Sequence, residues 1–218
     1  MNGLRIAVSW SGGKDSCLAF HRCLVRGAVP AALLTVFDEP MERSRSHGLR
    51  PEVVQAQADC LQVPLRVARA SWATYEVAFR AQLAALREDG VHDIVFGDID
   101  LPAHREWEER VCRDAGVRAH LPLWLGDRRQ LLDEFWAAGF VCRIVAVDRK
   151  HLDASVLGAE LTPTLVDAFV ARGIDACGEN GEFHTVVVDG PCFRRPLGLD
   201  FGRVVESGGY LAIDASPA

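Results

Sequence analysis

The stretch from residue 4 to residue 16 constrains the fold of this 218-residue chain more than any other. An apolar run over residues 4–8 is followed by a Ser-Gly-Gly turn at residues 11–13, and a helical pattern begins at Asp15. This order predicts a buried strand, a tight turn and a helix start, an arrangement that aims backbone N–H groups at an anion. The spacing differs from the GxxxxGK[ST] loop of kinases and GTPases and from the GxGxxG turn of dinucleotide folds.

The residues around this turn suit a phosphate ligand. Gly12 and Gly13 permit positive φ and let a phosphate approach the backbone closely, while Lys14 adds a mobile positive charge. Asp15 is a candidate ligand for Mg²⁺, which binds few carboxylates together with phosphate oxygens. It also suits the helix start as a negative charge near the dipole, and both interpretations stay open. The expected nucleotide-binding residues of this stretch are Ser9, Ser11, Gly12, Gly13, Lys14, Asp15 and Ser16.

Five glycines occupy the same place in the hydrophobic pattern. Each follows a helical segment and precedes an apolar, strand-like one, where glycine ends a helix at low cost; they are Gly27, Gly90, Gly116, Gly139 and Gly173. Repeated helix–glycine–strand units predict a parallel sheet covered by helices. The expected fold class is α/β: a Rossmann-like parallel sheet with helices on both faces over residues 1–124, and a smaller C-terminal α/β domain over residues 125–218.

The ranges of the secondary-structure elements follow from the same periodicity. In the first part, strands are expected near residues 4–9, 31–37, 64–69, 92–97 and 117–121, and helices near 15–26, 51–62, 74–89 and 104–115. In the second part we expect helices near 128–138 and 162–172, strands over 140–147 and 186–188, and a last strand within 202–214 with a turn at Gly208-Gly209. The polar stretch 38–50 is expected to be a loop at the sheet edge where open α/β sheets bind ligands.

Composition excludes several classes of protein. No apolar run reaches the length of a membrane helix, and the N-terminus enters a strand directly, so we expect neither a membrane protein nor a secretory leader. Seven cysteines form no CxxC pair, which favours reduced thiols and a cytoplasmic location. The net charge of −6 disfavours broad nucleic-acid binding, because phosphate backbones favour a basic surface.

A second polar signature lies at residues 178–185, Gly-Glu-Asn-Gly-Glu-Phe-His-Thr. Two carboxylates, an amide, an imidazole and a hydroxyl are costly to bury unless each meets a partner or a ligand. A solvated loop before a strand is the alternative interpretation. Glu182 and His184 alternate along an extended segment, so they are expected to face the same side.

Two resemblances rest on these motifs. SGGKDS at residues 11–16 resembles the PP-loop of the N-type ATP pyrophosphatases, which split ATP between its α- and β-phosphates. Together with the signature at 178–185, the segments Gly97-Asp98-Ile99, Pro122-Leu123-Trp124, Gly139-Phe140 and Asp189-Gly190-Pro191 make the chain similar to the diphthine–ammonia ligase family. The resemblance implies a PP-loop domain and a smaller α/β domain with the active site in the cleft between them. It also implies ATP-dependent adenylation of the carboxylate of diphthine on elongation factor 2, followed by amide formation with ammonium.

The resemblance suggests roles for individual residues. Catalytic candidates are Lys14, Asp15, Glu179, Glu182 and His184, and the candidates for binding the acceptor and the amine are Asn180, Glu182, His184 and Thr185. A carboxylate can hold ammonium and then accept its proton. His47 matches a histidine that the family carries and is expected to contact ATP. Gly97 and Asp98 end a strand at the same sheet edge, where Asp98 would bind the ribose of the nucleotide or a metal or, alternatively, cap a helix.

Alternatives remain for the function. Residues 97–109 depart from the family's pattern, so the acceptor is diphthine or a related carboxylate. His104, Arg105, Trp107 and Arg110 fit either an amphipathic helix or a grip on an acidic substrate. Sulfur transfer to a tRNA base is a second enzyme hypothesis, although the chain lacks a CxxC pair. A nucleotide-binding regulator with little catalysis is a third, and a homodimer is a candidate assembly.

Overall fold

The computed structural model describes residues 1–39, 43–44 and 47–218. It divides into two compact units. The first comprises Met1–Ser11, Asp15–Arg45 and Gln62–Leu125, and the second comprises Gly12–Lys14, Ser46–Leu61 and Gly126–Ala218. The division of the chain at residue 124 stays a prediction. Within the described ranges, no helix has both the length and the apolar character needed to cross a membrane.

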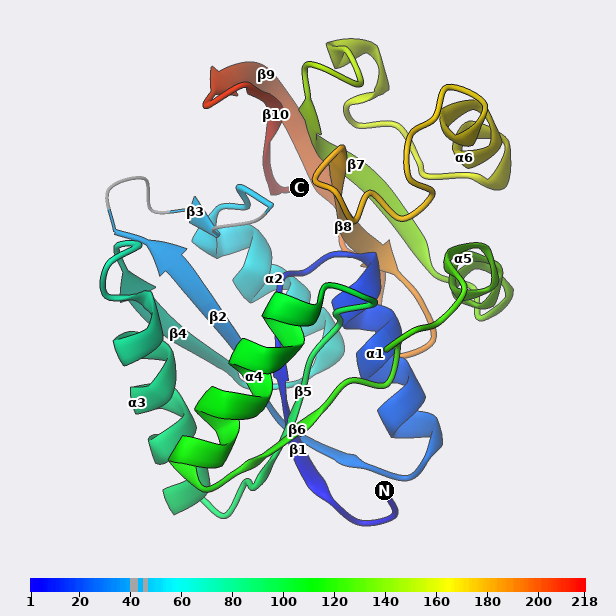
Figure 1. The fold of residues 1–218 in the computed structure, drawn as a ribbon. Coiled ribbons are helices and arrows are strands. Elements are labelled where there is room, and N and C mark those ends of the chain that lie inside the picture. The colour runs from blue at the N-terminus through cyan, green and yellow to red at the C-terminus, as the bar shows by residue number, and fades with distance from the viewer. Residues whose placement is uncertain (40–42, 45–46) are drawn as a thin grey trace. The chain divides into compact units, whose positions relative to one another are not determined.

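The first unit is built on a parallel sheet, as the repeated helix–glycine–strand units predict (Figure 1). Its strands lie in the order β4 (Leu65–Ala70), β2 (Val29–Asp38), β1 (Arg5–Ser9), β5 (Asp93–Val95) and β6 (Arg118–His120). Chain order reverses direction at β1, since β2 and β4 follow on one side and β5 and β6 on the other. The turn after β1 therefore begins at a topological switch point, the place where open α/β sheets bind ligands.

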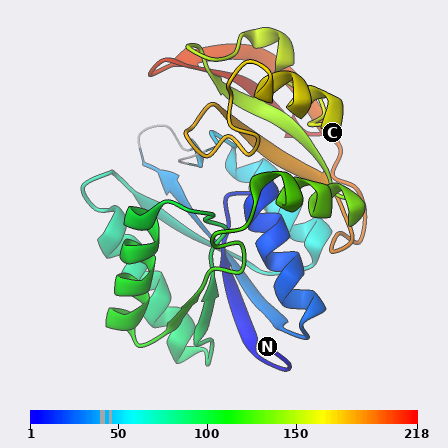
Figure 2. The ribbon, with the colours of Figure 1, turned by 45° about the vertical axis from the view of Figure 1, so that its right-hand side comes forward.

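Helices cover both faces of this sheet. Figure 2 shows α1 (Lys14–Val25) on one side of the strands and α3 (Tyr75–Glu88) and α4 (Pro102–Ala115) on the other. Because side chains alternate along a strand, Ala7 faces α3 and α4 while the fully buried Ile6 and Val8 face the opposite side. The predicted α/β class with helices on both faces is confirmed.

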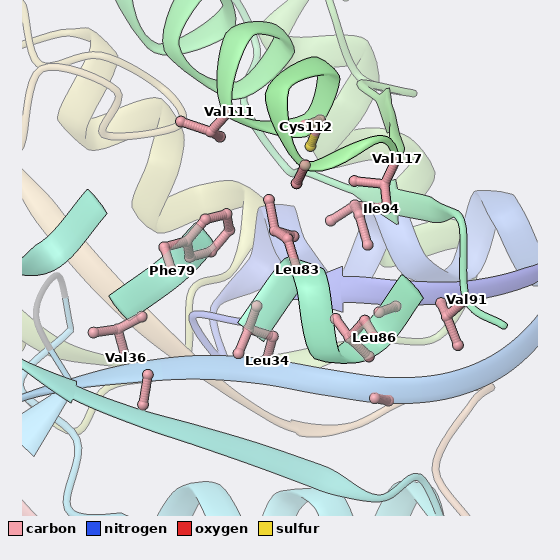
Figure 3. Packing of buried hydrophobic residues seen from close by; sticks show 14 of the residues in the cluster. Leu34, Val36, Phe79, Leu83, Leu86, Val91, Ile94, Val111, Cys112 and Val117 are labelled. Atoms are coloured by element: carbon pink, nitrogen blue, oxygen red, sulfur yellow. The ribbon is translucent and has the colours of Figure 1, made fainter. Parts of the chain in front are cut away.

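The core under α3 and α4 is a layer of interlocking apolar side chains (Figure 3). Helix α3 contributes Phe79, Leu83 and Leu86 at helical spacing, and strands contribute residues such as Leu34 and Ile94. Each such side chain contributes about 1.5–3 kcal/mol by leaving water. This layer fixes the strands whose carboxyl ends carry the polar residues described below.

The second unit has a different sheet. Strands β8 (Phe183–Asp189), β7 (Val141–Asp148), β10 (Tyr210–Pro217) and β9 (Leu199–Ser207) pair antiparallel in that order. The helices of this unit are α2 (Pro51–Leu61), α5 (Arg128–Ala137) and α6 (Pro163–Val170), with a 3₁₀ turn at Ala154–Val156. Gly208 and Gly209 both have positive φ, as a two-residue hairpin turn requires, so the turn predicted there is confirmed.

Three segments differ from the sequence expectation. The C-terminal segment forms two paired strands, β9 and β10, where a single strand with a turn was expected. Strand β8 begins at Phe183, so the last three of the eight residues of the second polar signature belong to a strand. The expected loop at 38–50 contains a short strand, β3 (Arg43–Ser44), which pairs with the end of β2; residues 40–42 and 45–46 lie outside the described residues.

Leu83→Ala tests the packing of the first unit. Leu83 is fully buried at the centre of the layer, so its truncation is expected to lower the free energy of unfolding by about 2–5 kcal/mol. Val77→Ala on the same helix is the matched control, because Val77 is 71% exposed. Urea denaturation followed by circular dichroism measures both. Equal losses in the two variants would contradict the core described here.

Candidate nucleotide site

The glycine turn between β1 and α1 is the centre of the candidate site. Gly12 has φ +80°, whereas φ of Gly13 is not positive, so only the first glycine uses the left-handed region. Gly13 is needed for space: a Cβ there would lie 2.2 Å from Cε1 of His47. The predicted need for two glycines thus has two different physical causes.

In the first unit, five polar residues lie at the carboxyl ends of β1 and β5 or in the first turn of α1. They are Ser9, Ser11, Asp15, Ser16 and Asp98. The hydroxyls of Ser11 and Ser16 are 3.1 Å apart and share a hydrogen bond. A Cβ at Gly97 would lie 2.8 Å from the backbone nitrogen of Ser16, so only glycine lets the chain after β5 pass this close to α1.

Asp98 belongs to a small acid cluster at the start of α4. Its Oδ1 lies 2.7 Å from Nδ1 of His104. Burial acts to raise the pKa of Asp98, but hydrogen bonds from His104 and Glu108 outweigh it and hold that pKa below its usual value. Burial and the charge of Asp98 raise the pKa of Glu108 to about 10. Asp98 is thus a carboxylate and Glu108 a neutral acid at neutral pH.

In the second unit, the turn is bound to strand β8. The N–H of Val187 donates to the carbonyl of Gly12 at 2.9 Å, and the N–H of Lys14 donates to Oγ1 of Thr185 at 3.1 Å. The Lys14 side chain is only 4% exposed, and its ammonium donates to the carbonyl of Cys177. Thr185, predicted as an acceptor-binding residue, is therefore also a partner of the turn.

Two histidines lie beside this contact. Nδ1 of His47 is 2.6 Å from the carbonyl oxygen of Thr185, and because a carbonyl only accepts, this nitrogen carries the proton. The rings of His47 and His184 are 4.9 Å apart between centroids. Burial, with the nearby His47 and Lys14, lowers the pKa of His184 to about 3. His184 is therefore neutral at neutral pH and a weak base, able to accept a hydrogen bond.

The loop before β8 is organised by Glu182, which is 3% exposed. Its carboxylate accepts hydrogen bonds at 3.1 Å from the backbone N–H of Asp175, the backbone N–H of Asn180 and the Asn180 amide. Burial acts to raise the pKa of Glu182, but these bonds outweigh it and leave that pKa below its usual value. The Asp175 carboxylate accepts in turn from the backbone N–H of Cys177 and Glu179.

Within the second unit, six predicted residues lie at or beside the turn: Gly12, Gly13, Lys14, His47, His184 and Thr185. Asn180 and Glu182 are hydrogen-bonded to each other in the loop before β8, which also contains Glu179. Ser9, Ser11, Asp15, Ser16, Gly97 and Asp98 belong to the first unit. The sequence analysis missed Gln57 and Glu108. A polar residue in the apolar stripe of α2 was the available signal for Gln57, because its helical neighbours Val53, Val54, Ala58 and Leu61 are all buried.

Packing between helices accounts for the side chains of Trp107 and Arg110 on α4. Arg110 donates two hydrogen bonds to Glu76, at 2.8 and 2.7 Å, and the indole N–H of Trp107 donates to the same carboxylate at 2.9 Å. These side chains join α4 to α3. The amphipathic-helix interpretation of residues 104–110 accounts for them without a substrate.

Among the described residues, no group of three His, Cys, Asp or Glu side chains is placed to hold a metal ion. Asp15 as a Mg²⁺ ligand stays a prediction, and it is compatible with this finding because nucleotide-bound magnesium takes most of its ligands from phosphate and water.

A pocket of about 390 Å³ lies at the amino ends of β1, β5 and β6, lined in part by Arg5, Asp93 and Arg118. It contains none of the predicted site residues.

Glu108→Gln tests the neutral acid beside Asp98. Between the ordinary carboxyl pKa of 4.5 and the raised value near 10, the folded chain holds a proton that the unfolded chain has lost. The contribution of this proton to the free energy of unfolding therefore decreases as pH rises through that interval. The glutamine variant lacks this pH dependence, so the melting temperature of the variant minus that of the unsubstituted protein is expected to increase from pH 5 to pH 9. Glu106→Gln, at an exposed position of the same helix, is the control, and a flat difference for Glu108→Gln would contradict the assignment.

Comparisons with known proteins match two family models to this chain. A family model described as "Diphthamide synthase N-terminal domain" matches residues 4–119, and one described as "Diphthamide synthase C-terminal domain" matches residues 127–215. A solved structure, the predicted subunit of a tRNA methyltransferase from Methanocaldococcus jannaschii, is 16% identical and covers 85% of this chain and 97% of its own. The TM-score between the two structures is 0.47.

Curated relatives named diphthine–ammonia ligase are similar along most of the chain. The rat protein is 26% identical over 232 residues, which is 93% of this chain and 85% of its own. The human protein is 26% identical over 231 residues with the same coverage. The Schizosaccharomyces pombe protein is 26% identical over 222 residues, 90% of this chain but 36% of its own. Both family models and these relatives lead to one conclusion: the chain belongs to the diphthamide synthase family.

Proposed function

We propose that this chain is an ATP-dependent ligase that converts a carboxylate into an amide. In the first step the carboxylate oxygen attacks the α-phosphorus of ATP, forming an acyl adenylate and releasing pyrophosphate. In the second step ammonia attacks the acyl carbon, AMP leaves, and the amine loses a proton. Diphthine on elongation factor 2, or a related carboxylate, is the acceptor. The relatives named diphthine–ammonia ligase support this reaction class.

The observation that carries the proposal is the glycine turn at the switch point of the parallel sheet. A turn there, followed by a helix N-terminus, presents backbone N–H groups to an anion. One helix end contributes about 0.3–1 kcal/mol at an exposed site, whereas enzymatic rate enhancements need on the order of 8 kcal/mol or more. The turn therefore acts with the Lys14 ammonium and the hydroxyls of Ser9, Ser11 and Ser16. Magnesium held by Asp15 would neutralise phosphate charge when bound.

Further nucleotide contacts are assigned to three residues. Asp98, an ionised carboxylate at the end of β5, is proposed to accept from ribose hydroxyls, and Gly97 keeps the chain close to α1 at that point. His47 has its Nδ1 proton committed to the carbonyl of Thr185. In the neutral imidazole Nε2 is then an acceptor, suited to an N–H or hydroxyl donor of the nucleotide.

The loop before β8 is proposed to bind the amine and the acceptor. The Glu182 carboxylate already accepts three N–H donors, so we assign it the conformation of the loop. Glu179 is assigned the ammonium ion, because its own backbone N–H is fixed by Asp175 and its carboxylate charge suits a cation. Neutral His184 and Thr185 would orient the acceptor. A cytoplasmic location and a homodimer stay predictions.

Pyrophosphate release tests the reaction class. Candidate carboxylates, beginning with diphthine-bearing elongation factor, are supplied with ATP and ammonium, and AMP, pyrophosphate and the mass of the acceptor are measured. A ligase yields AMP, pyrophosphate and an amide. Products of ADP and phosphate would refute the proposal, a sulfur-containing product would favour thiolation, and nucleotide binding without turnover would favour a regulator.

Lys14→Met is expected to lower the rate of pyrophosphate release by about a hundredfold, the typical effect of removing one donor that stabilises developing charge. Lys150→Met is the matched control, since Lys150 is exposed and its side chain plays no part in the proposed site. Steady-state kinetics of both variants give the comparison. A Lys14→Met enzyme as fast as the Lys150→Met enzyme would remove Lys14 from the mechanism.

Glu179→Gln and Glu182→Gln separate the two loop carboxylates. Glu179→Gln is expected to raise the KM for ammonium and leave acceptor adenylation near its normal rate, because only the amine site loses charge. Glu182→Gln places an amide where a backbone N–H now donates, so it is expected to lower the melting temperature and both half-reactions. If Glu182→Gln were to alter only the ammonium KM, the two roles would have to be exchanged.

A further inference from the structure

Gln57 is a buried amide that the proposed site does not yet use. It lies on α2 at 0% exposure, within the apolar stripe of that helix. A primary amide carries two donor hydrogens and an acceptor oxygen, and burying it without partners costs free energy. A residue of this kind in an apolar stripe therefore needs specific hydrogen-bond partners.

The Gln57 amide nitrogen donates to two backbone carbonyls. Nε2 donates to the carbonyl of Gly12 at 2.9 Å and to the carbonyl of Val187 at 2.7 Å. The Gly12 carbonyl accepts a second bond from the N–H of Val187 at 2.9 Å. Two donors from two different elements thus fix the direction of this one carbonyl.

Gln57 also accounts for the glycine at position 12. A Cβ at Gly12 would lie 2.7 Å from Oε1 of Gln57 and 3.1 Å from Cδ1 of Leu49. Contacts under about 3 Å force something to move, and the Gln57 amide is held at its nitrogen by two carbonyls. The Gln57 side chain therefore occupies the space that a side chain at position 12 would need, so the two residues depend on each other.

The direction of the Gly12 carbonyl determines the direction of the next amide. The peptide between Gly12 and Gly13 is trans and planar, so its C=O and N–H point in opposite directions. With the carbonyl turned toward Gln57 and Val187, the N–H of Gly13 is turned away from both. In an anion-binding turn, the orientation of such an N–H decides whether it reaches the ligand.

Helix α2 is itself anchored within the second unit. Nε of Arg50, the residue before α2, donates to Oδ1 of Asp214 on β10 at 2.7 Å, and a second guanidinium nitrogen pairs with Oδ2. A bidentate Arg–carboxylate pair adds geometric specificity. The start of α2, the helix that carries Gln57, is therefore held against strand β10 by this ion pair.

We propose that Gln57 is a positioning residue that orients the Gly13 N–H toward the pyrophosphate portion of ATP. The inference rests on the proposed function, because it assumes that the turn binds those phosphates. The two hydrogen bonds that Nε2 of Gln57 donates to Gly12 and Val187 both go to the backbone. Its removal is expected to affect ligands with a pyrophosphate group and to spare those without one.

The test compares three probes by titration calorimetry: α,β-methylene-ATP, inorganic pyrophosphate and AMP. Gln57→Leu retains the size of the side chain and removes both donors. It is expected to bind the first two probes about tenfold more weakly, the effect of one ordinary hydrogen bond, and to bind AMP as before. Gln55→Leu is the matched control, because Gln55 is exposed on the same helix and donates to Asp59 at 2.9 Å.

Outcomes separate this inference from the proposed function. A Gln57→Leu variant with unchanged affinity for pyrophosphate, or with equal losses for pyrophosphate and AMP, overturns the positioning role. If Gln57→Leu is not recovered folded, Gln57→Asn carries the same test, since it keeps the amide but is too short to reach both carbonyls. An unsubstituted protein that binds neither α,β-methylene-ATP nor pyrophosphate would instead overturn the proposed function.

Discussion

The carbonyl of Gly12 accepts two hydrogen bonds, from Val187 and from Gln57, and the conformation of the turn depends on this. A glycine turn alone is flexible, because glycine loses more conformational freedom on ordering than other residues. Here strand β8 and helix α2 restrict that freedom from outside the turn. The bond between Lys14 N–H and Thr185 continues the same contact two residues later. A phosphate ligand would meet a turn that is already ordered.

Burial and charge divide the acidic residues into two kinds. Glu182 and Asp175 accept from backbone N–H groups of the loop, and Asp175 also pairs with Arg128 of α5 at 2.8 Å. Asp98 keeps its charge through His104 and the neutral acid of Glu108. Glu182 and Asp175 therefore stabilise the conformation of the loop, whereas Asp98 presents a fixed negative charge beside α1. That contrast supports assigning Asp98, rather than Glu182, a direct contact with ligand.

The parallel sheet was predictable because its signals are local. Glycines such as Gly27, Gly90 and Gly116 stand at helix ends, and all three have positive φ, the property on which the prediction rested. The antiparallel sheet was harder, because pairing of β7 with β8 and β10 is non-local and no periodicity records it. The polar signature at 178–185 was recognisable, but its division into loop and strand was not. Strand β8 begins inside it at Phe183, a large apolar side chain that is fully buried.

Gln57 and Glu108 were missed for a related reason. Each is a polar residue at a buried helix position, and helix periodicity alone treats such a position as a break in the apolar stripe. Its meaning comes from partners on other elements: Gly12 and Val187 for Gln57, and Asp98 for Glu108. Burying a polar group without a partner costs about 1–3 kcal/mol, so most buried polar groups have at least one partner. A lone polar residue in an apolar stripe is therefore better understood as evidence for a specific contact whose other half the sequence does not reveal.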